Sequence, residues 1–252
     1  MPVTGIRIMA AKHRIIMADD AYPLAPLALL RLQSWLSPAF PIGSYSYSHG
    51  LEWAVDSGHV HDRKSLVAWL DADLSHGSGR NEAILFTETW HCAVSRDSTR
   101  LIKIAELAAA LRATSELALE SSQPGTACLT TLRLVWPDQA LDSLERMLRE
   151  RQISPALAVV LATRAARSGI PLPLALPAFL QSYIANWVTA GVRLIPLGQT
   201  DGQLAIAELE NSVLAASAQA SDANMNDLGS AALMIDLASM AHETQYTRLF
   251  RS

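Results

Sequence analysis

The sequence predicts an all-α protein, folded as a single globular domain of roughly ten helices. Composition is the first observation, because the 252 residues include 40 alanines and 37 leucines, two strong helix formers. Spacing is the second, since apolar residues recur at helical intervals from Leu27 onward. The third is that no segment shows a convincing alternating strand pattern. The four residues 132–135 are strand-like in type, but helical patterns flank them. No fixed repeat or long linker interrupts the chain, which favours one domain.

Prolines, glycines and capping residues set the boundaries of the early helices. The first helix must end before Pro38, because the residue before a proline disfavours the helical conformation. A turn rich in proline follows. Ser44 is then expected to cap a helix through Val55, with Gly58 as its C-terminal stop. Either Asp62 or Ser65 is expected to cap the next one. The expected helices are, in order, 27–37, 44–55, 65–74, 81–95, 97–119, 126–135, 137–151, 154–169, 174–192, 203–220 and 231–248.

The later boundaries rest on similar signals. Asp97 is expected to begin a long helix, which 121–125 kinks or interrupts. Asp138 follows a proline and opens a shorter helix, and Pro155 follows a serine cap at the position that suits proline best. The segment 196–202 contains proline and two glycines, and it ends the most apolar helix of the chain.

Residues 1–26 are expected to be a disordered N-terminal extension, and 27–252 the folded domain with a C-terminal interaction tail. The apolar segment behind the N-terminal basic residues is too short for a signal peptide. The longest uncharged apolar stretch, 170–181, holds three prolines and is too short and too broken to span a bilayer. Two cysteines, Cys92 and Cys128, suit a reducing compartment. A cytoplasmic protein is therefore expected.

Charge and hydropathy point to protein partners. The formal net charge is −4, which argues against nucleic-acid binding, since that function needs a basic face. Charged residues make up 17% of the chain, below the roughly 25% that is usual in soluble domains. Hydrophobic residues make up 50%. Such a chain has apolar surface left for assembly after it has filled its core.

The search for catalytic and metal-binding motifs is largely negative. The chain has no Gly-x4-Gly-Lys-Ser/Thr phosphate-binding loop. The hydroxyl-rich run 43–50 does not fit the Gly-x-Ser-x-Gly nucleophile motif. His59 and His61 are weak candidates for an open metal site, because a closed zinc site needs four ligands at tight spacing. No tightly bound cofactor is expected.

Two segments carry residue types typical of binding surfaces. Tyr45, His49 and Glu52 are spaced four and three apart, which would place them on one face of the helix capped by Ser44. The C-terminal segment 240–252 combines aromatic residues with arginine, the types that dominate binding hot spots.

Five stretches of the chain, in unbroken order, resemble the urease accessory protein UreF family. They are 37–52 (SPAFPIGSYSYSHGLE), 112–116 (RATSE), 121–125 (SSQPG), 190–203 (AGVRLIPLGQTDGQ) and 236–252 (DLASMAHETQYTRLFRS). The resemblance covers about 27–252 and is specific, because several motifs match together.

This resemblance implies a non-catalytic, all-α, dimer-forming chaperone of urease maturation. The implied partners are UreD (also called UreH), the GTPase UreG and apo-urease, into which the complex inserts nickel. Nickel would be handled transiently by the complex, without a tight site in this chain. The residues expected to contact UreD or UreG are Tyr45, His49, Glu52, Tyr246, Arg248, Phe250 and Arg251. A polar surface or channel is expected at Arg193, Gln199 and Asp201.

Two other classes of function stay open at this stage. One is a helical scaffold or adaptor for another metalloenzyme, which would share the composition but not the partners. The other is an all-α hydrolase or transferase that uses Tyr45, His49 and Glu52. General acid–base chemistry would require a cleft that brings these groups to one reacting atom.

Overall fold

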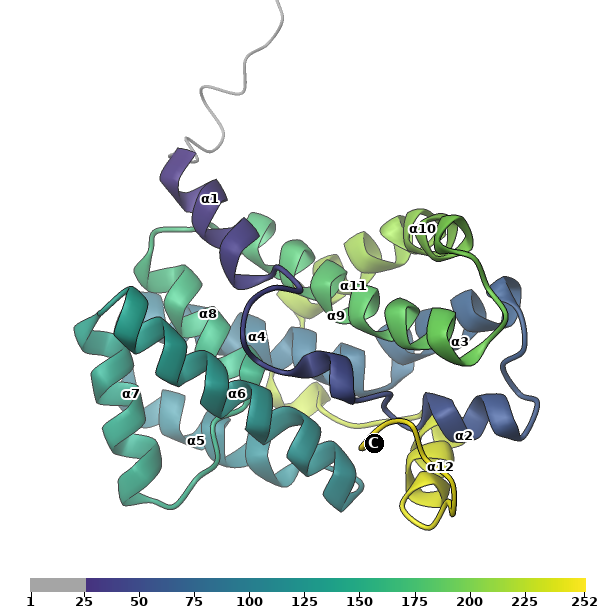
Figure 1. Ribbon diagram of the computed structural model, residues 1–252. Helices are drawn as coiled ribbons and strands as arrows, with labels where there is room; N and C mark the ends of the chain where they lie inside the picture. Colours follow the sequence, from purple (N-terminus) through teal and green to yellow (C-terminus); the bar gives the residue numbers. More distant parts are fainter. Residues whose placement is uncertain (1–25) are drawn as a thin grey trace, which may run out of the picture.

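A computed structural model describes residues 26–252, and this part of the chain is built from α-helices and two short 3-10 turns without any strand (Figure 1). The predicted all-α class is therefore confirmed. The extension expected at 1–26 lies outside the described residues, except that Pro26 begins the first helix. The elements are α1 (Pro26–Trp35), η1 (Ser44–Ser46), α2 (Leu51–Asp56), α3 (Arg63–His76), α4 (Ser78–Ser95), α5 (Ser98–Ala110), α6 (Ser115–Val135), α7 (Gln139–Glu150), α8 (Leu157–Arg167), α9 (Leu172–Leu194), α10 (Gln199–Glu208), α11 (Glu210–Asp222), η2 (Met225–Asp227) and α12 (Leu233–His242).

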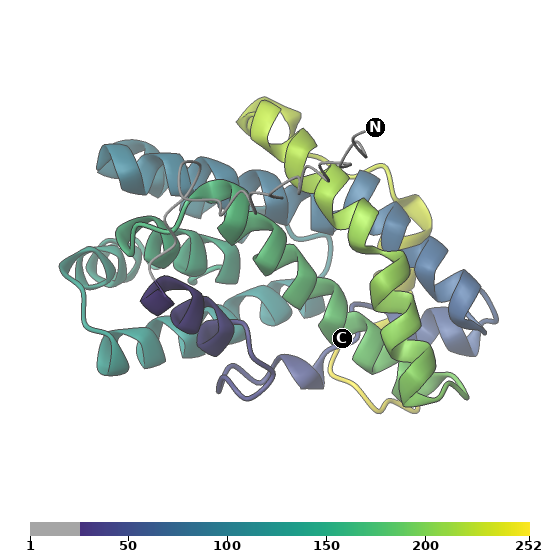
Figure 2. The same cartoon turned by 90° about the horizontal axis from the view of Figure 1, so that it is seen from above.

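Helix α4 lies at the centre of the core. Twelve of its 18 residues are buried, and it packs most extensively along α8. Phe86 of α4 stacks on Phe179 of α9, with the ring centroids 4.9 Å apart. Figure 2 shows the green helix α9 crossing the middle of the molecule, with the yellow-green α11 beside it. Five of the twelve buried residues of α4 are polar, and one of them, Glu82, is paired with the Arg112 guanidinium at 2.6 Å.

The long helix expected at 97–119 is in fact two helices. Helix α5 ends at Ala110, and the hydroxyl of Thr114 caps α6 by accepting a hydrogen bond from the Leu117 N–H at 3.1 Å. The interruption expected at 121–125 does not occur, because α6 continues through Pro124. At the next position, Gly125, a side chain would collide with the backbone carbonyl of Pro155, so this glycine serves a close approach between α6 and the segment before α8.

Ser44 does not cap a helix that runs to Val55. It begins the single 3-10 turn η1, and α2 begins only after Gly50, whose φ of +75° is left-handed. A Cβ at Gly50 would lie 2.6 Å from the backbone nitrogen of Ser239 in α12. The chain therefore needs glycine here for two reasons, the left-handed backbone and the close contact with α12. Figure 1 shows α2 and α12 side by side at the lower right.

Further boundaries differ from the expected ones. The helix expected at 203–220 is split at Leu209 into α10 and α11, and α10 already begins at Gln199. The helix predicted at 154–169 begins at Leu157, after the expected cap and proline. The helix expected at 231–248 ends at His242, so the residues that follow it are not helical. The caps at Asp62, Asp97 and Asp138 are confirmed by side-chain hydrogen bonds to the first turns of their helices.

Within 26–252, each helix is too short or too polar to cross a lipid bilayer.

Candidate functional site

Residues 243–252, which we call the tail, fold back onto the body of the protein. Glu52 in the first turn of α2 receives two backbone hydrogen bonds from the tail. The Leu249 N–H donates to its Oε1 at 2.6 Å, and the Phe250 N–H donates to its Oε2 at 2.8 Å. Glu52 is buried, so its carboxylate has exchanged water for backbone donors. One side chain thus holds two successive backbone N–H groups of the tail.

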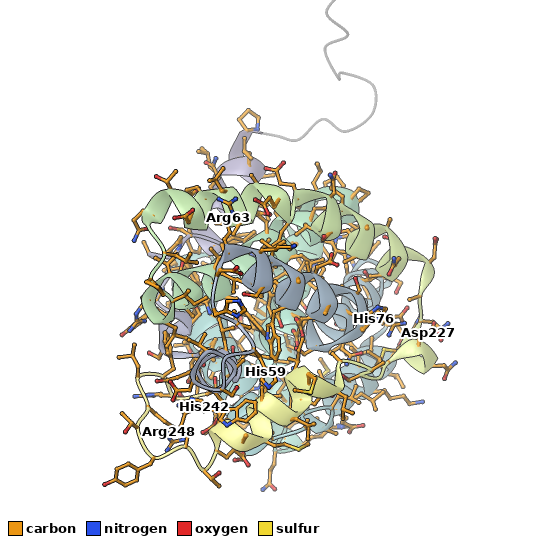
Figure 3. The ribbon with its side chains drawn as sticks, turned by 90° about the vertical axis from the view of Figure 1, so that its right-hand side faces the viewer. His59, Arg63, His76, Asp227, His242 and Arg248 are labelled. Atoms are coloured by element: carbon orange, nitrogen blue, oxygen red, sulfur yellow. The ribbon has the colours of Figure 1, made fainter. Side chains whose placement is uncertain are left out.

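A second carboxylate, Glu116 in the first turn of α6, contacts the last residue of α12 and Arg248 of the tail. Its Oε2 lies 2.7 Å from Nδ1 of His242, and its Oε1 accepts a hydrogen bond from Arg248 at 2.6 Å. The other ring nitrogen of His242 lies 3.3 Å from Glu52, so the imidazole bridges two buried carboxylates. Figure 3 shows His242 on α12 and Arg248 on the loop that follows it. Buried charges need such partners, since an unpaired one is strongly destabilising.

The last residues of the tail lie against the η1 turn. The backbone N–H of Arg251 donates to the Ser46 carbonyl at 2.9 Å, and the Ser48 N–H donates to the Ser252 carbonyl at 2.7 Å. The Ser252 hydroxyl donates to Oε2 of Glu120 at 2.7 Å. Turn and tail therefore pair through their backbones at Ser46 and Ser48.

The ring of Phe250 is buried beneath the guanidinium of Arg193. The Cζ atom of Arg193 lies 4.4 Å from the ring centroid, which is a cation–π contact. Arg193 also donates to the backbone carbonyl of Tyr45 at 3.1 Å. The end of α9, the η1 turn and the tail thus meet at one place.

His49, whose φ of 58° is left-handed, is buried beside this junction. Its Nδ1 lies 3.2 Å from Oε2 of Glu120, its Nε2 lies 2.6 Å from the hydroxyl of Ser78, and its ring packs on Trp187 with centroids 4.4 Å apart. Burial lowers the pKa of His49, but the Glu120 carboxylate outweighs this, so the pKa is raised above 6.5 overall. The fold therefore favours the protonated ring.

Ser78, His49 and Glu120 follow one another as in a nucleophile relay, but the surroundings of Ser78 prevent that chemistry. The Ser78 hydroxyl donates to Asp73 at 2.9 Å, so it accepts a hydrogen bond from His49 rather than giving up a proton to it. The backbone N–H groups of Ser78 and Gly79 also donate to Asp73 and are not free for an oxyanion. The cluster holds α3, α4 and the turn together, and it offers no nucleophile.

The structure separates the residues that were expected to share one helix face. Tyr45 lies on η1 with 69% of its surface exposed, whereas His49 and Glu52 are buried and belong to the turn and to α2. The prediction of a shared helix face was therefore wrong. The physical reason is Gly50, whose left-handed backbone delays the start of the helix.

The tail residues named from the sequence also divide into two groups. Tyr246, Arg248 and Arg251 are exposed, while Phe250 is buried. The Phe250 side chain, like those of His49 and Glu52, is engaged inside the chain, where it positions the tail instead of facing solvent. The exposed residues stay predictions for partner contact.

The expected polar surface at 193–201 is not one unit. Arg193 contacts the tail, whereas Asp201 accepts a hydrogen bond from Arg63 of α3 at 3.2 Å. Gln199 begins α10 and is exposed. Figure 3 shows Arg63 near the top of the molecule in this view and Arg248 near the bottom.

His59 and His61 are exposed in the loop between α2 and α3. His59 lies against Trp53, with the ring centroids 5.8 Å apart, and His61 lies 3.9 Å from Asp62. Over the described part of the chain, no group of three or more His, Cys, Asp or Glu side chains is placed to hold a metal ion.

Three residues that position the tail were not singled out from the sequence: Glu116, Glu120 and His242. Glu116 and Glu120 are four residues apart on α6 and so lie on the same helix face. This spacing is a usable signal, although it does not indicate which segment the two carboxylates face. His242 lies within a helical pattern and carries no mark that distinguishes a bridging histidine from a surface one.

Comparison with known proteins identifies the relatives of the chain. The family model described as UreF matches residues 60–210. A urease accessory protein UreF from Rhodopseudomonas palustris (strain TIE-1) is 46% identical over 225 residues, which are 89% of this chain and 92% of that protein. A protein of the same name from Bradyrhizobium diazoefficiens is 43% identical, covering 94% of this chain and 97% of the relative. One from Granulibacter bethesdensis is 44% identical, covering 94% of this chain and 100% of the relative.

Proposed function

The chain belongs to the UreF family of urease accessory proteins, and from this premise we propose that it assembles with UreD/UreH and the GTPase UreG to insert nickel into apo-urease. In this proposal the chain is a non-catalytic chaperone that works in the cytoplasm. The nucleotide chemistry belongs to UreG, and nickel is the cargo of the whole complex. The chain itself contributes recognition surfaces.

The observation that carries the proposal is the surface around the docked tail. Tyr246 is fully exposed, and Arg248 and Arg251 flank it in sequence. Aromatic and arginine side chains are the most frequent binding hot spots. Because backbone hydrogen bonds to Glu52 fix the tail, these side chains are held in position before a partner arrives, which lowers the entropy lost on binding.

Helix α12 adds an apolar face next to the tail. Leu233, Leu237 and Met240 are spaced four and three apart, and all of them are exposed. Soluble monomers rarely leave such contiguous apolar surface uncovered. Together with the tail this face has the composition of a protein interface, an apolar centre with an arginine-containing rim.

A homodimer is also part of the proposal. Leu27, Leu29 and Leu30 of α1 are exposed, so the chain has a second apolar face apart from that of α12. Two faces would allow a second copy and a heterologous partner to bind at the same time. The mass in solution, measured by light scattering at several concentrations, tests the dimer.

Co-purification tests the proposed partners. We expect tagged wild-type chain, co-expressed with UreD, UreG and urease in nickel-supplemented cells lacking their own UreF, to recover UreD and UreG and to restore urease activity. The double variant Tyr45→Ala, Tyr246→Ala should recover at least about tenfold less UreD, since two exposed aromatic anchors are lost. Leu134→Ala removes an exposed apolar side chain on α6 and is the matched control.

The outcomes separate three conclusions. Failure of the wild-type chain to recover either partner would overturn the proposed assembly. Recovery of components of a different metalloenzyme would favour the adaptor function instead. Wild-type-like recovery by the double variant would leave the assembly intact and exclude these two tyrosines from its interface.

A further inference from the structure

A cavity of about 230 Å³ lies between the turn that follows α1 and the helices α6, α8 and α9. Its walls are mainly apolar, with Leu117, Leu161, Phe179 and Trp187 among the residues that line it. An engineered cavity of about 150 Å³ in another protein is large enough to admit benzene. The volume here therefore suits a molecule built on a single aromatic ring.

Two ion pairs contribute polar groups to this lining. Arg112 donates to Glu82 at 2.6 Å, and both side chains are 9% exposed. His49 lies 3.2 Å from Glu120, and these two residues line the cavity as well. Each pair brings together opposite charges, so neither sign dominates the site when His49 is protonated.

Some residues that line the cavity also have unsatisfied hydrogen-bond donors. Nη2 of Arg112 and Nε1 of both Trp35 and Trp187 are buried without a hydrogen-bond partner. Buried donors are normally satisfied, and leaving one unsatisfied destabilises a protein by about 1–3 kcal/mol. Three such donors among the residues around one cavity indicate that an acceptor is missing.

We propose that this cavity is a binding site for a small neutral aromatic molecule that carries one hydrogen-bond acceptor. The ring would pack among Phe179, Trp187 and Leu161, and the acceptor would face Arg112. Because the charges of the two ion pairs balance, a carboxylate or an ammonium head group would lose its hydration in the cavity without gaining a free counter-charge. A neutral amide oxygen avoids this cost. The proposal concerns a ligand of the chain itself and does not depend on its protein partners.

Benzamide is the probe that tests this site, because it combines a phenyl ring with a neutral carbonyl. We expect saturable one-site binding to the full chain, measured by ligand-observed NMR and by the quenching of tryptophan fluorescence. Benzoate and benzylamine have the same ring with an anionic and a cationic head group. Both should bind at least about tenfold more weakly, a difference of about 1.4 kcal/mol.

The control variants place the probe in the cavity. Ala185 of α9 is half-buried and lines the cavity, so Ala185→Trp should fill part of it and weaken benzamide binding at least about tenfold. Ala215→Trp adds the same bulk at an exposed position of α11 and should leave binding unchanged. If Ala185→Trp does not fold, Thr189→Trp on the exposed rim of the same cavity takes its place.

Each remaining result would overturn part of the proposal. Absence of saturable benzamide binding, or equal affinity in the wild type and the cavity-filling variant, would show that the cavity is not the site. Tighter binding of benzoate or benzylamine than of benzamide would overturn the proposed preference for a neutral head group.

Discussion

Helix α4 and the tail are both buried in this protein, but different forces hold them there. Helix α4 contributes twelve buried residues, most of them apolar, and neighbouring helices surround it. The tail has no regular structure and buries one large apolar side chain, Phe250. It is held by polar contacts to Glu52, Glu116 and Glu120.

This difference concerns how stabilising free energy is distributed. Apolar packing is spread over many small contacts, so the loss of one side chain weakens the packing of many neighbours in the core. A buried carboxylate concentrates its effect, because its removal leaves several donors unpaired at once. We therefore expect substitutions in α4 to lower global stability, and substitutions at the glutamates to release the tail first.

The largest effect is expected for Phe86→Ala in α4. Phe86 is almost fully buried and stacks on Phe179, so its truncation leaves a cavity. Phenylalanine-to-alanine changes in cores lower the free energy of unfolding by about 3–5 kcal/mol. Urea denaturation followed by circular dichroism should show one cooperative transition at lower urea. A loss below about 1 kcal/mol would mean that α4 is not the centre of the core.

A somewhat smaller global effect, with a stronger local one, is expected for Glu52→Ala. The Leu249 and Phe250 N–H groups lose their acceptor, and His242 loses one of its two carboxylates. Breaking a buried charged contact lowers the free energy of unfolding by about 3 kcal/mol. Hydrogen exchange should report loss of protection in the tail well before the helices open.

Glu52→Gln is the matched control for that experiment. Its carbonyl keeps one acceptor in place, so it should retain part of the protection that Glu52→Ala loses. Equal protection of the tail in the wild type and in Glu52→Ala would contradict the view that this carboxylate docks the tail.

Sequence patterns predicted α4 well and the tail poorly, for the same physical reason. The helix expected at 81–95 was found at Ser78–Ser95. It could be located because the positions of a helix that pack on neighbouring helices tend to carry apolar residues at helical spacing. The tail motif was recognised, but it was expected to be helical as far as Arg248. Its course depends on carboxylates more than 120 positions away in sequence, which no local pattern shows.

The same limit applies to the candidate site. Tyr45 and Tyr246 are exposed, and their role in partner contact stays a prediction. The helix face that Tyr45 was expected to share with His49 and Glu52 was wrong. One left-handed glycine, Gly50, overrode the helical spacing. Asp62, one of the two residues predicted as a cap, is the cap in the structure, and it could be predicted because a capping residue acts on its own next turn.

His49 lies where the turn, the tail and the core meet, and its protonation makes the free energy of unfolding depend on pH. Its pKa is raised above 6.5; burial opposes this rise, while Glu120 and Asp73 favour it against Arg112. A raised pKa means that the stabilisation is complete below pH 6.5 and is lost as the pH rises through the pKa of the folded state.

The stability difference between the wild type and His49→Asn should therefore shrink from pH 6 to pH 9. Asparagine tolerates the left-handed backbone at this position, so the variant tests the charge and not the turn. Denaturant titrations at four pH values measure this difference. A difference that grows with pH would contradict a protonated, Glu120-paired ring.

The smallest effect on stability is expected for Tyr246→Ala, although Tyr246 belongs to the same tail as Phe250. Its side chain is fully exposed, so its truncation removes almost no packing. Exposed substitutions of this kind change the free energy of unfolding by about 0.5 kcal/mol or less. Urea denaturation should therefore superimpose on the wild type, and hydrogen exchange of the tail should be unchanged. A marked loss of protection would mean that the Tyr246 side chain holds the tail. With stability unchanged, any loss of partner binding in this variant is attributable to the missing phenol ring, because the backbone contacts to Glu52 are still made.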